Sequence, residues 1–375
     1  MKYVYATVPA VLLSVLAACS NTYQQPVGGT TPVVPSSVHS TAGSAYILSI
    51  FAVAPGKLRP DDIVQLGTSI FVVYQDNNVN PDGTLAAGVT SAQALVIEYD
   101  SNGNVLHTFD VPGHPDGIVA LNATTLWVSS NEDANPLISI INTTTNAVTT
   151  LTSDVATLPH GGGLDDMKVI GGTVFTSASN PTLTTTPVPN LAPYSTDASG
   201  STALYGVSTE PAIYSLTLNP DGKTFHVTPV LYSSTPATLL PGATAITLNM
   251  TDPDSSAIDP QGDLVTVSQQ DSEIVYLQNP TTPNPTVSVL PLTLYGNPWP
   301  VDDIRWSPNT TGAFMLLSDN PAGLVYRILA ATGFTPGTVY AAGQGTLLTV
   351  NTTTGAMTPI YVGMENPHGL IFATD

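Results

Sequence analysis

Aspartate and histidine recur in this sequence where a short polar turn leads into an alternating apolar run. The six such openings are Arg59-Pro60-Asp61-Asp62-Ile63, His114-Pro115-Asp116-Gly117-Ile118, Gly163-Leu164-Asp165-Asp166-Met167, Asp254-Ser255-Ser256-Ala257-Ile258, Pro300-Val301-Asp302-Asp303-Ile304 and Asn366-Pro367-His368-Gly369-Leu370. The third residue of each opening, which precedes a small or acidic residue, is in turn Asp61, Asp116, Asp165, Ser256, Asp302 and His368. If these side chains converge, the clustered carboxylates either raise one another's pKa or require a cation.

Two metal sites are compatible with these residues. Clustered carboxylates suit Ca²⁺, or Mg²⁺ with retained waters, better than a soft metal, and the first set is Asp61, Asp116, Asp165, Asp302 and His368. Three imidazoles around one axis can hold Zn²⁺ with an open position for water, and the second set is His114, His160 and His368. The alternative to both is structural, because Asp often caps its own backbone in a turn.

No catalytic residue can be assigned from these patterns. The sequence has no Gly-x-Ser-x-Gly phrase of the kind that presents a nucleophilic serine. Gly161-Gly162-Gly163 is not followed by Lys-Ser or Lys-Thr, so it is not a phosphate-binding loop. The chemistry that the sequence supports is therefore cation binding rather than nucleophilic catalysis.

The spacing of the openings indicates the elements that must position them. A repeat of roughly 40–50 residues with several strands per unit is typical of a β-propeller. We predict an all-β, six-bladed propeller in which the strand at 45–52 and the final strand share one blade. We expect Asp302 and Asp303 to open a fifth blade containing GAFMLLSDN and GLVYRILA. Seven blades are the alternative, if TVYAAGQ, TLLTVNTTTG and MTPIYVG form a further blade.

In such a fold the openings of the innermost strands lie on one face, which we call the mouth face. Any functional site is expected there, at the end of the central channel. The chain has 27 Asp and Glu against 7 Lys and Arg, a formal charge of −20. That balance excludes nucleic acid as a partner, because phosphate binding needs clustered basic residues.

The amino-terminal segment predicts export. Met1-Lys2 is a short basic head, and the apolar stretch from Val4 to Leu16 is too short for a permanent membrane span. It ends in Leu16-Ala17-Ala18-Cys19, which resembles the lipobox of bacterial lipoprotein signal peptides. The resemblance implies cleavage before Cys19 and acylation of that residue.

The chain divides accordingly into three parts. We predict a signal peptide at 1–18, the acylated Cys19 with a flexible linker at 19–44, and the propeller at 45–375. Cys19 is the only cysteine, which excludes an internal disulfide and a catalytic thiol elsewhere. Ser20 is not acidic, which favours the outer membrane. The expected location is therefore extracytoplasmic, with the lipid as the only membrane contact.

The phrases HPDGIVALNATTLWVSSN, SSAIDPQGDLVTVSQQDSEIVYL and ENPHGLIFATD resemble the repeats of NHL-type and SMP-30/gluconolactonase-like six-bladed propellers. In the lactonase branch, the resemblance implies a divalent metal at the channel mouth, held by a Glu from an early blade and by later Asn and Asp residues. This sequence lacks the Glu-Gly-Pro phrase of that branch, and Pro115-Asp116-Gly117 is its nearest match to Pro-Asn-Gly. No catalytic role is carried over.

The first functional hypothesis is a monomeric, lipid-anchored propeller that binds a protein, glycan or small molecule on its acidic mouth face, with or without a divalent cation. The alternative is a metal-dependent hydrolase or lyase of a small substrate. Convergence of three carboxylates or histidines at metal-ligand distances, beside a cavity, would favour the enzyme. A splayed ring of carboxylates around a filled channel would favour the binding protein.

Overall fold

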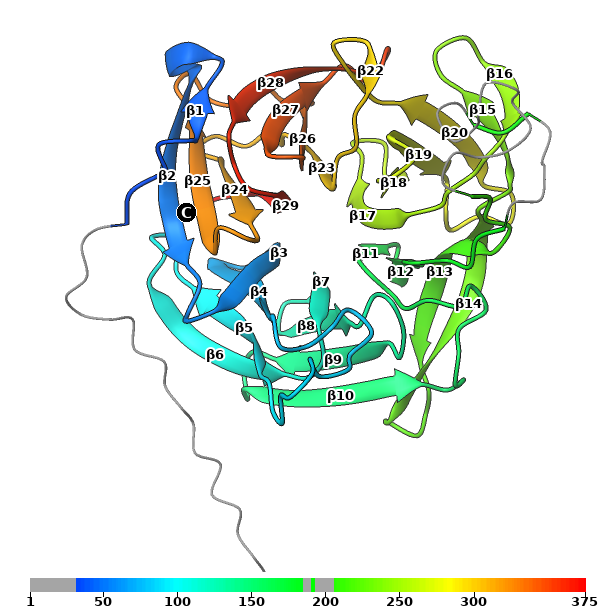
Figure 1. Cartoon of the computed structure of the whole chain (residues 1–375), viewed down its shortest axis with the longest axis horizontal. Helices are drawn as coiled ribbons and strands as arrows, with labels where there is room; N and C mark the ends of the chain where they lie inside the picture. Colours follow the sequence, from blue (N-terminus) through cyan, green and yellow to red (C-terminus); the bar gives the residue numbers. More distant parts are fainter. Residues whose placement is uncertain (1–31, 185–189, 193–205) are drawn as a thin grey trace, which may run out of the picture.

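The computed structural model describes residues 32–184, 190–192 and 206–375. Over these residues the chain forms a ring of six four-stranded antiparallel blades around a central channel (Figure 1). Among the residues described, the one helical segment is a 3₁₀ turn, η1 (Gly43–Ala45), and no helix is long and apolar enough to cross a membrane. The prediction of an all-β, six-bladed propeller is confirmed.

The first three blades follow one another along the chain, with the innermost strand first. Blade 1 contains β3 (Leu58–Leu66), β4 (Ser69–Asp76), β5 (Ala94–Tyr99) and β6 (Val105–Val111). Blade 2 contains β7 (Pro115–Asn122), β8 (Thr125–Ser130), β9 (Leu137–Asn142) and β10 (Ala147–Ser153). Blade 3 contains β11 (Met167–Ile170), β12 (Thr173–Ser177), β13 (Pro211–Leu218) and β14 (Thr224–Tyr232). The outer strands β10 and β14 pair in parallel, which joins blades 2 and 3.

The other blades carry added strands or exchange strands. Blade 4 contains β17 (Pro253–Ile258), β18 (Leu264–Ser268), β19 (Glu273–Gln278) and β20 (Thr286–Pro291), and the hairpin β15 (Pro236–Leu239) and β16 (Thr244–Thr247) extends its outer edge. Blade 5 contains β23 (Asp303–Trp306), β26 (Val339–Gly343), β27 (Thr346–Val350) and β28 (Ala356–Val362), with β1 (His39–Ser40), β21 (Thr293–Leu294) and β22 (Asn297–Pro298) at its outer edge. Blade 6 contains β29 (Pro367–Ala373), β24 (Phe314–Asp319), β25 (Leu324–Ala330) and β2 (Tyr46–Val53).

Blade 6 closes the ring as predicted, since it contains both the first long strand and the last strand of the chain. The predicted content of blade 5 is wrong, because β24 and β25 pair with β29 and β2 instead of β23. The three strands after Ala330 complete blade 5, so they do not form a seventh blade. The alternating pattern identifies each strand but carries no information about which inner strand it joins.

Part of the segment predicted to be a linker is packed against the propeller. His39 pairs with Val362, and the backbone N–H of Thr41 donates to the carbonyl of Ile360 at 2.8 Å. This segment and the hairpin β21–β22 cover the outer edge of β28, which would otherwise expose unpaired backbone groups. Cys19 and the signal sequence lie outside the described residues.

Four of the innermost strands begin with the same β-bulge. In each bulge the inner strand advances by three residues while its hydrogen-bonded partner advances by two. The matched segments are Pro60 to Ile63 with Tyr74 to Val72, Pro115 to Ile118 with Ser130 to Val128, Pro253 to Ser256 with Ser268 to Thr266, and Pro367 to Leu370 with Asp319 to Leu317. Bulges tolerate proline and re-aim the side chains beside them. The residue after each proline, Asp61, Asp116, Asp254 or His368, lines a cavity at the channel mouth.

A second aspartate ties neighbouring blades together. The Asp62, Asp166 and Asp303 carboxylates of blades 1, 3 and 5 accept hydrogen bonds from Ile118 N at 3.0 Å, Ser256 N at 2.7 Å and Leu370 N at 2.7 Å, in blades 2, 4 and 6. Glycine is required beside two of these bonds. A Cβ on Gly117 would overlap the backbone of Asp166, and one on Gly369 would overlap that of Asp62. The three bonds therefore join the inner strands in pairs.

We expect Asp166→Ala to lower the free energy of unfolding by about 1–3 kcal/mol, because the buried Ser256 N–H loses its acceptor. Asp166→Asn should cost less, since the amide oxygen can still accept. Urea unfolding measures both values, with the exposed Asp110→Ala as the control. Equal stability of the wild type and both Asp166 variants would contradict the role assigned to these bonds.

Candidate functional site

A cavity of about 240 Å³ lies at the channel mouth. Its lining includes all five residues of the first predicted metal set, Asp61, Asp116, Asp165, Asp302 and His368, together with His114, Glu132, Asp252, Asp254 and neutral polar side chains. Every blade contributes to this wall. The cavity is therefore the place where the recurring openings of the sequence meet.

Blade 4 contributes Asp254 to the cavity, not Ser256, the residue aligned with the other five from the sequence. Ser256 occupies the position of Ile118 and Leu370, whose N–H groups bind the aspartates of the preceding blades. The alignment was two residues wrong for the side chain at the mouth, because it matched the small residue instead of the proline. Pro253 marks the correct register.

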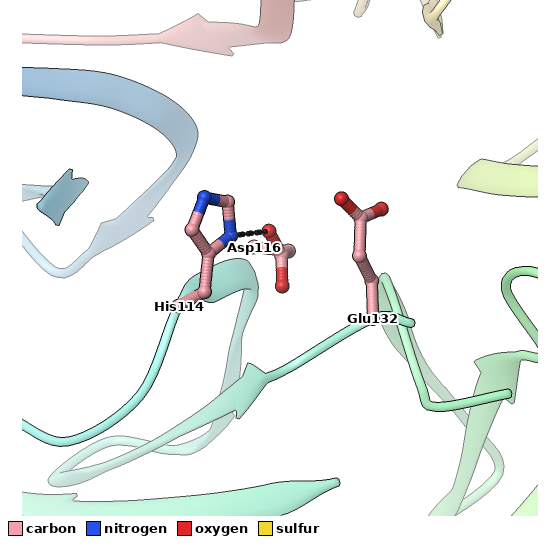
Figure 2. A group of neighbouring side chains, drawn as sticks. All are labelled: His114, Asp116 and Glu132. Carbon is pink, nitrogen blue, oxygen red and sulfur yellow. Dashed lines mark hydrogen bonds and ion pairs between the residues drawn. The ribbon is translucent and has the colours of Figure 1, made fainter. Parts of the chain in front are cut away.

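Three side chains of blade 2 converge in a geometry suited to a metal ion (Figure 2). One ligand atom from each of His114, Asp116 and Glu132 lies within 4.8 Å of the other two. The Oδ1 atom of Asp116 is 3.0 Å from His114 Nδ1 and accepts from Gln75 Nε2 at 2.9 Å. The Oδ2 atom is buried and has no hydrogen-bond partner. A buried carboxylate oxygen without a partner is rare and indicates a missing ligand.

The sequence did not identify Glu132 as a ligand. It follows β8, whereas His114 and Asp116 flank the start of β7, so all three lie at the open end of one antiparallel pair, where Pro115 pairs with Ser130. The signal was present, because the β7–β8 phrase ends at Asn131-Glu132. Register across the hairpin, which sequence spacing does not give, brings Glu132 beside the opening.

The electrostatic state of the three groups favours a cation. Burial, followed by the Asp116 charge, raises the pKa of Glu132 to about 8, and burial raises the pKa of Asp116 well above its usual range. Burial lowers the pKa of His114, so its ring is neutral at pH 7 and available as a ligand. Without a cation, the site therefore holds extra protons on its carboxyl groups.

His368 belongs to a separate group in the same cavity. Its Nδ1 lies 3.1 Å from Asp302 Oδ2, which also accepts from Gln269 Nε2 at 3.1 Å. Burial alone would lower the pKa of His368, but the Asp302 and Asp61 charges outweigh that effect and raise it to about 10. His368 is therefore a cation at neutral pH. The Asn366 Nδ2 atom lies 2.7 Å from its Nε2, and a protonated ring, which donates from both nitrogens, requires the amide oxygen in that place.

Gln75 connects the two groups. Its Nε2 donates to Asp116 Oδ1 at 2.9 Å and to Asp61 Oδ2, and its Oε1 accepts from Asn320 Nδ2 at 2.9 Å. Gln75 is buried, so this network has fixed geometry. It holds carboxylates of blades 1 and 2 side by side without neutralising either one.

The three histidines of the second predicted set do not meet. His160 is fully buried away from the cavity, and its Nδ1 and Nε2 lie 2.8 Å from Tyr214 OH and from the Gly163 carbonyl oxygen. Because burial lowers its pKa to about 4, the neutral ring donates from Nε2 and accepts at Nδ1. His160 is thus a core residue, and His114 and His368 occupy different parts of the wall.

Basic side chains of the channel do not line the cavity. Lys168 Nζ donates to Asp166 Oδ1 at 2.6 Å, and Arg305 binds Asp303 and, at 2.7 Å, the Ser256 carbonyl. Both cations are therefore engaged with the aspartates that tie the blades together. The lining keeps nine acidic residues and has no Lys or Arg, so its field favours cations.

No protein-family model and no curated protein matches this sequence. Similar solved structures include a streptogramin B lyase (13% identity over 89% of this chain and 100% of that one, TM-score 0.44) and a putative gluconolactonase (12% over 88% and 99%, TM-score 0.39). The virginiamycin B lyase of Staphylococcus aureus is 9% identical over 87% and 99%, with a TM-score of 0.38. At these scores, the fold rests on the blades of this chain, and no activity is transferred.

We expect the metal-free protein to lose stability as pH rises from about 4 to 8. The folded pKa values of Asp252 and Glu132 are raised to about 6 and 8, above the ~4 of an unfolded carboxyl group, so ionisation disfavours the folded state. The raised pKa of His368 acts in the same direction above about pH 6.5. Urea unfolding in EDTA at pH 5, 7 and 8.5 measures the trend, and Glu132→Gln should flatten it. Stability that rises with pH would contradict this account.

Proposed function

We propose that this chain is a metal-dependent hydrolase or lyase that acts on a small, polar, neutral or cationic molecule. The observation that carries the proposal is the convergence of His114, Asp116 and Glu132 within 4.8 Å, with the buried Oδ2 of Asp116 unpartnered. The adjoining cavity leaves space for a substrate beside these three residues. A divalent cation would neutralise the carboxylates and satisfy the free oxygen.

The donor set fits several divalent ions. Oxygen ligands lie about 2.3–2.6 Å from Ca²⁺, so atoms on opposite sides of the ion can be ~4.6–5.2 Å apart. Zn²⁺ ligands lie about 2.0–2.2 Å away, so zinc would draw the most separated atoms slightly closer. The two carboxylates supply oxygen ligands, which suit Ca²⁺ and Mn²⁺. The imidazole supplies a nitrogen ligand, which suits Zn²⁺. This set replaces the purely oxygen-rich ring as the best-supported site.

Residues of the chain would supply the rest of the chemistry. When bound, the metal would polarise a substrate oxygen or activate a water molecule. His368 holds a proton at neutral pH, and Asp302 at 3.1 Å stabilises that charge. A proton held in this way can be delivered to a leaving group. Gln75 keeps Asp61 and Asp116 in place while the charge changes.

The lining restricts the substrate. Nine acidic residues line the cavity against the single cation His368 and no Lys or Arg, so the lining repels anions, and its other members are His114, Gln, Asn, Ser and Gly, with no aliphatic, Phe, Tyr or Trp side chain. A volume of about 240 Å³ limits the group that can enter the cavity to a small one. The substrate class that fits is therefore small, hydrophilic and not negatively charged. The acidic wall and a bound cation also suit a binding protein, which remains the second candidate.

The proposed setting is outside the cytoplasm. The lipobox-like Leu16-Ala17-Ala18-Cys19 and the polar stretch after it support a monomer tethered to a bacterial membrane. Ser20 favours the outer membrane. A tethered enzyme would meet small solutes that reach the cell surface. Residues 1–31, which include Cys19, are outside the described residues, so this part of the proposal rests on the sequence alone.

Metal analysis of the purified protein tests the function first. We expect a stoichiometric divalent ion, and calorimetry of the stripped protein with Zn²⁺, Mn²⁺ or Ca²⁺ identifies the preferred one. Asp116→Asn should weaken binding by at least the roughly 10–100-fold seen for groups around a metal, while the exposed His226→Ala should not.

Turnover then separates the two candidates. Metal-dependent cleavage of small esters, lactones or amines, lost in Asp116→Asn, would support the enzyme. Metal binding without turnover across that panel would favour the binding protein. Absence of any bound or bindable ion would overturn both metal-dependent proposals.

We also expect Cys19→Ser to release the protein from the membrane fraction, because serine has no thiol to carry the thioether lipid. Fractionation after labelling with a radioactive fatty acid measures both association and acylation. Label and membrane association retained in Cys19→Ser would contradict the lipoprotein proposal. Release with normal metal affinity would show that the anchor and the cavity act independently.

A further inference from the structure

Asn131 connects two of the three candidate ligands without lining the cavity itself. It lies directly after β8 and immediately before Glu132, and it is 3% exposed. Its φ of 70° is in the left-handed region, which Asn tolerates better than most residues. This conformation turns the chain at the end of the strand, so that the next side chain, Glu132, reaches the mouth.

Three hydrogen bonds fix Asn131. Its Oδ1 accepts from the backbone N–H of His114 at 2.8 Å, and its own backbone N–H donates to the His114 carbonyl at 2.7 Å. Its Nδ2 donates to the Asn135 carbonyl at 2.9 Å. The backbone of His114 is therefore held from two sides by the residue that precedes Glu132.

Two glycines make room for this amide. A Cβ on Gly113 would overlap Oδ1 of Asn131, and a Cβ on Gly83 would overlap its Nδ2. The Glu132 carbonyl accepts from Gly163 N at 2.7 Å, which fixes the far side of the turn on blade 3. The geometry of both ligands thus depends on one buried side chain.

We infer that Asn131 is a positioning residue that holds His114 and Glu132 at metal-ligand separation. The inference rests on the proposed metal site and deepens it. It also accounts for the convergence of ligands from both strands at the open end of a hairpin. Groups of this kind, which orient ligands without touching the ion, typically change metal affinity by roughly 10–100-fold when removed.

The repeat supplies matched anchors in other blades. Asp271 accepts from Thr251 N at 2.7 Å in blade 4, and Asp319 accepts from Asn366 N at 2.8 Å in blade 6. These carboxylates hold the corresponding openings. In blade 2 the neutral amide of Asn131 accepts the bond from the opening instead. It lies beside Asp116 and Glu132, where another negative charge would add to the repulsion.

The experiment compares ion affinity with the stability of the metal-free protein. Calorimetry at 25 °C with the ion that the wild type prefers, tested as Zn²⁺, Mn²⁺ and Ca²⁺ alone, gives Kd, and melting in EDTA gives Tm. Asn131→Gly keeps the left-handed conformation and loses only the side chain, so we expect Kd to rise about 10–100-fold. Asn131→Asp keeps the acceptor for the His114 N–H but loses the donor to the Asn135 carbonyl and adds a charge beside Glu132, so we expect it to recover only part of the affinity. Asp271→Gly should lower Tm and leave Kd within about twofold, since blade 4 supplies no ligand.

The outcomes distinguish the proposed metal site from the positioning role of Asn131. A wild-type protein that binds none of the three ions would overturn the metal site and the inference together. A wild type that binds, with Asn131→Gly unchanged in Kd, would overturn the inference alone. An equal loss of affinity in Asp271→Gly would also overturn it, because the effect would then come from general loosening of the mouth.

Discussion

The hydrogen bond from a backbone N–H of one inner strand to an aspartate of the blade before it is the constraint on which the channel mouth depends. It occurs at three of the six blade junctions, through Asp62, Asp166 and Asp303. Each bond needs an accepting carboxylate on one blade and a small residue beside the N–H that donates from the next blade, which explains the alternation of Asp-Asp with Asp-Gly, Asp-Ser or His-Gly. The opening sequences recur along the chain because the inner strands are joined in pairs in the same way.

The two residues of each opening have different roles because they lie at successive positions beside a bulge. The second residue is satisfied by backbone donors and by Lys168 or Arg305, so it stabilises the ring. The first residue points to the cavity, and burial raises the pKa of Asp61, Asp116, Asp165 and Asp254 well above the usual range. Aspartates adjacent in sequence thus separate into structural and ligand-facing groups.

The periodicity of the sequence predicted the number of blades and the way in which the ring closes. Six openings gave six blades, and an unpartnered strand at each end gave the shared closing blade, because strand pattern and edge protection are local properties. It did not predict that β24 and β25 join blade 6, since a strand's pattern is the same whichever neighbour it pairs with. Asp254 and Glu132 were missed for a related reason. Asp254 is located by the bulge after Pro253, two residues before the residue aligned from the sequence, and Glu132 by the pairing of β7 with β8, and sequence spacing gives neither of these.

The concentration of charge at the mouth is unfavourable for folding alone. Lys168 and Arg305 already pair with Asp166 and Asp303, and protonated His368 is the one cation among the lining residues, so most of the cavity carboxylates have no cationic partner. The wall instead keeps neutral Gln75, Gln269, Asn320 and Asn366 between its carboxylates, which orient the acids without titrating them. Such a wall holds its charge available for a cation from solution. The Oδ2 of Asp116, buried and without a hydrogen-bond partner, lies beside a neutral imidazole and a Glu132 that holds a proton in the absence of an ion, so a cation bound here would displace that proton and pair with the carboxylates.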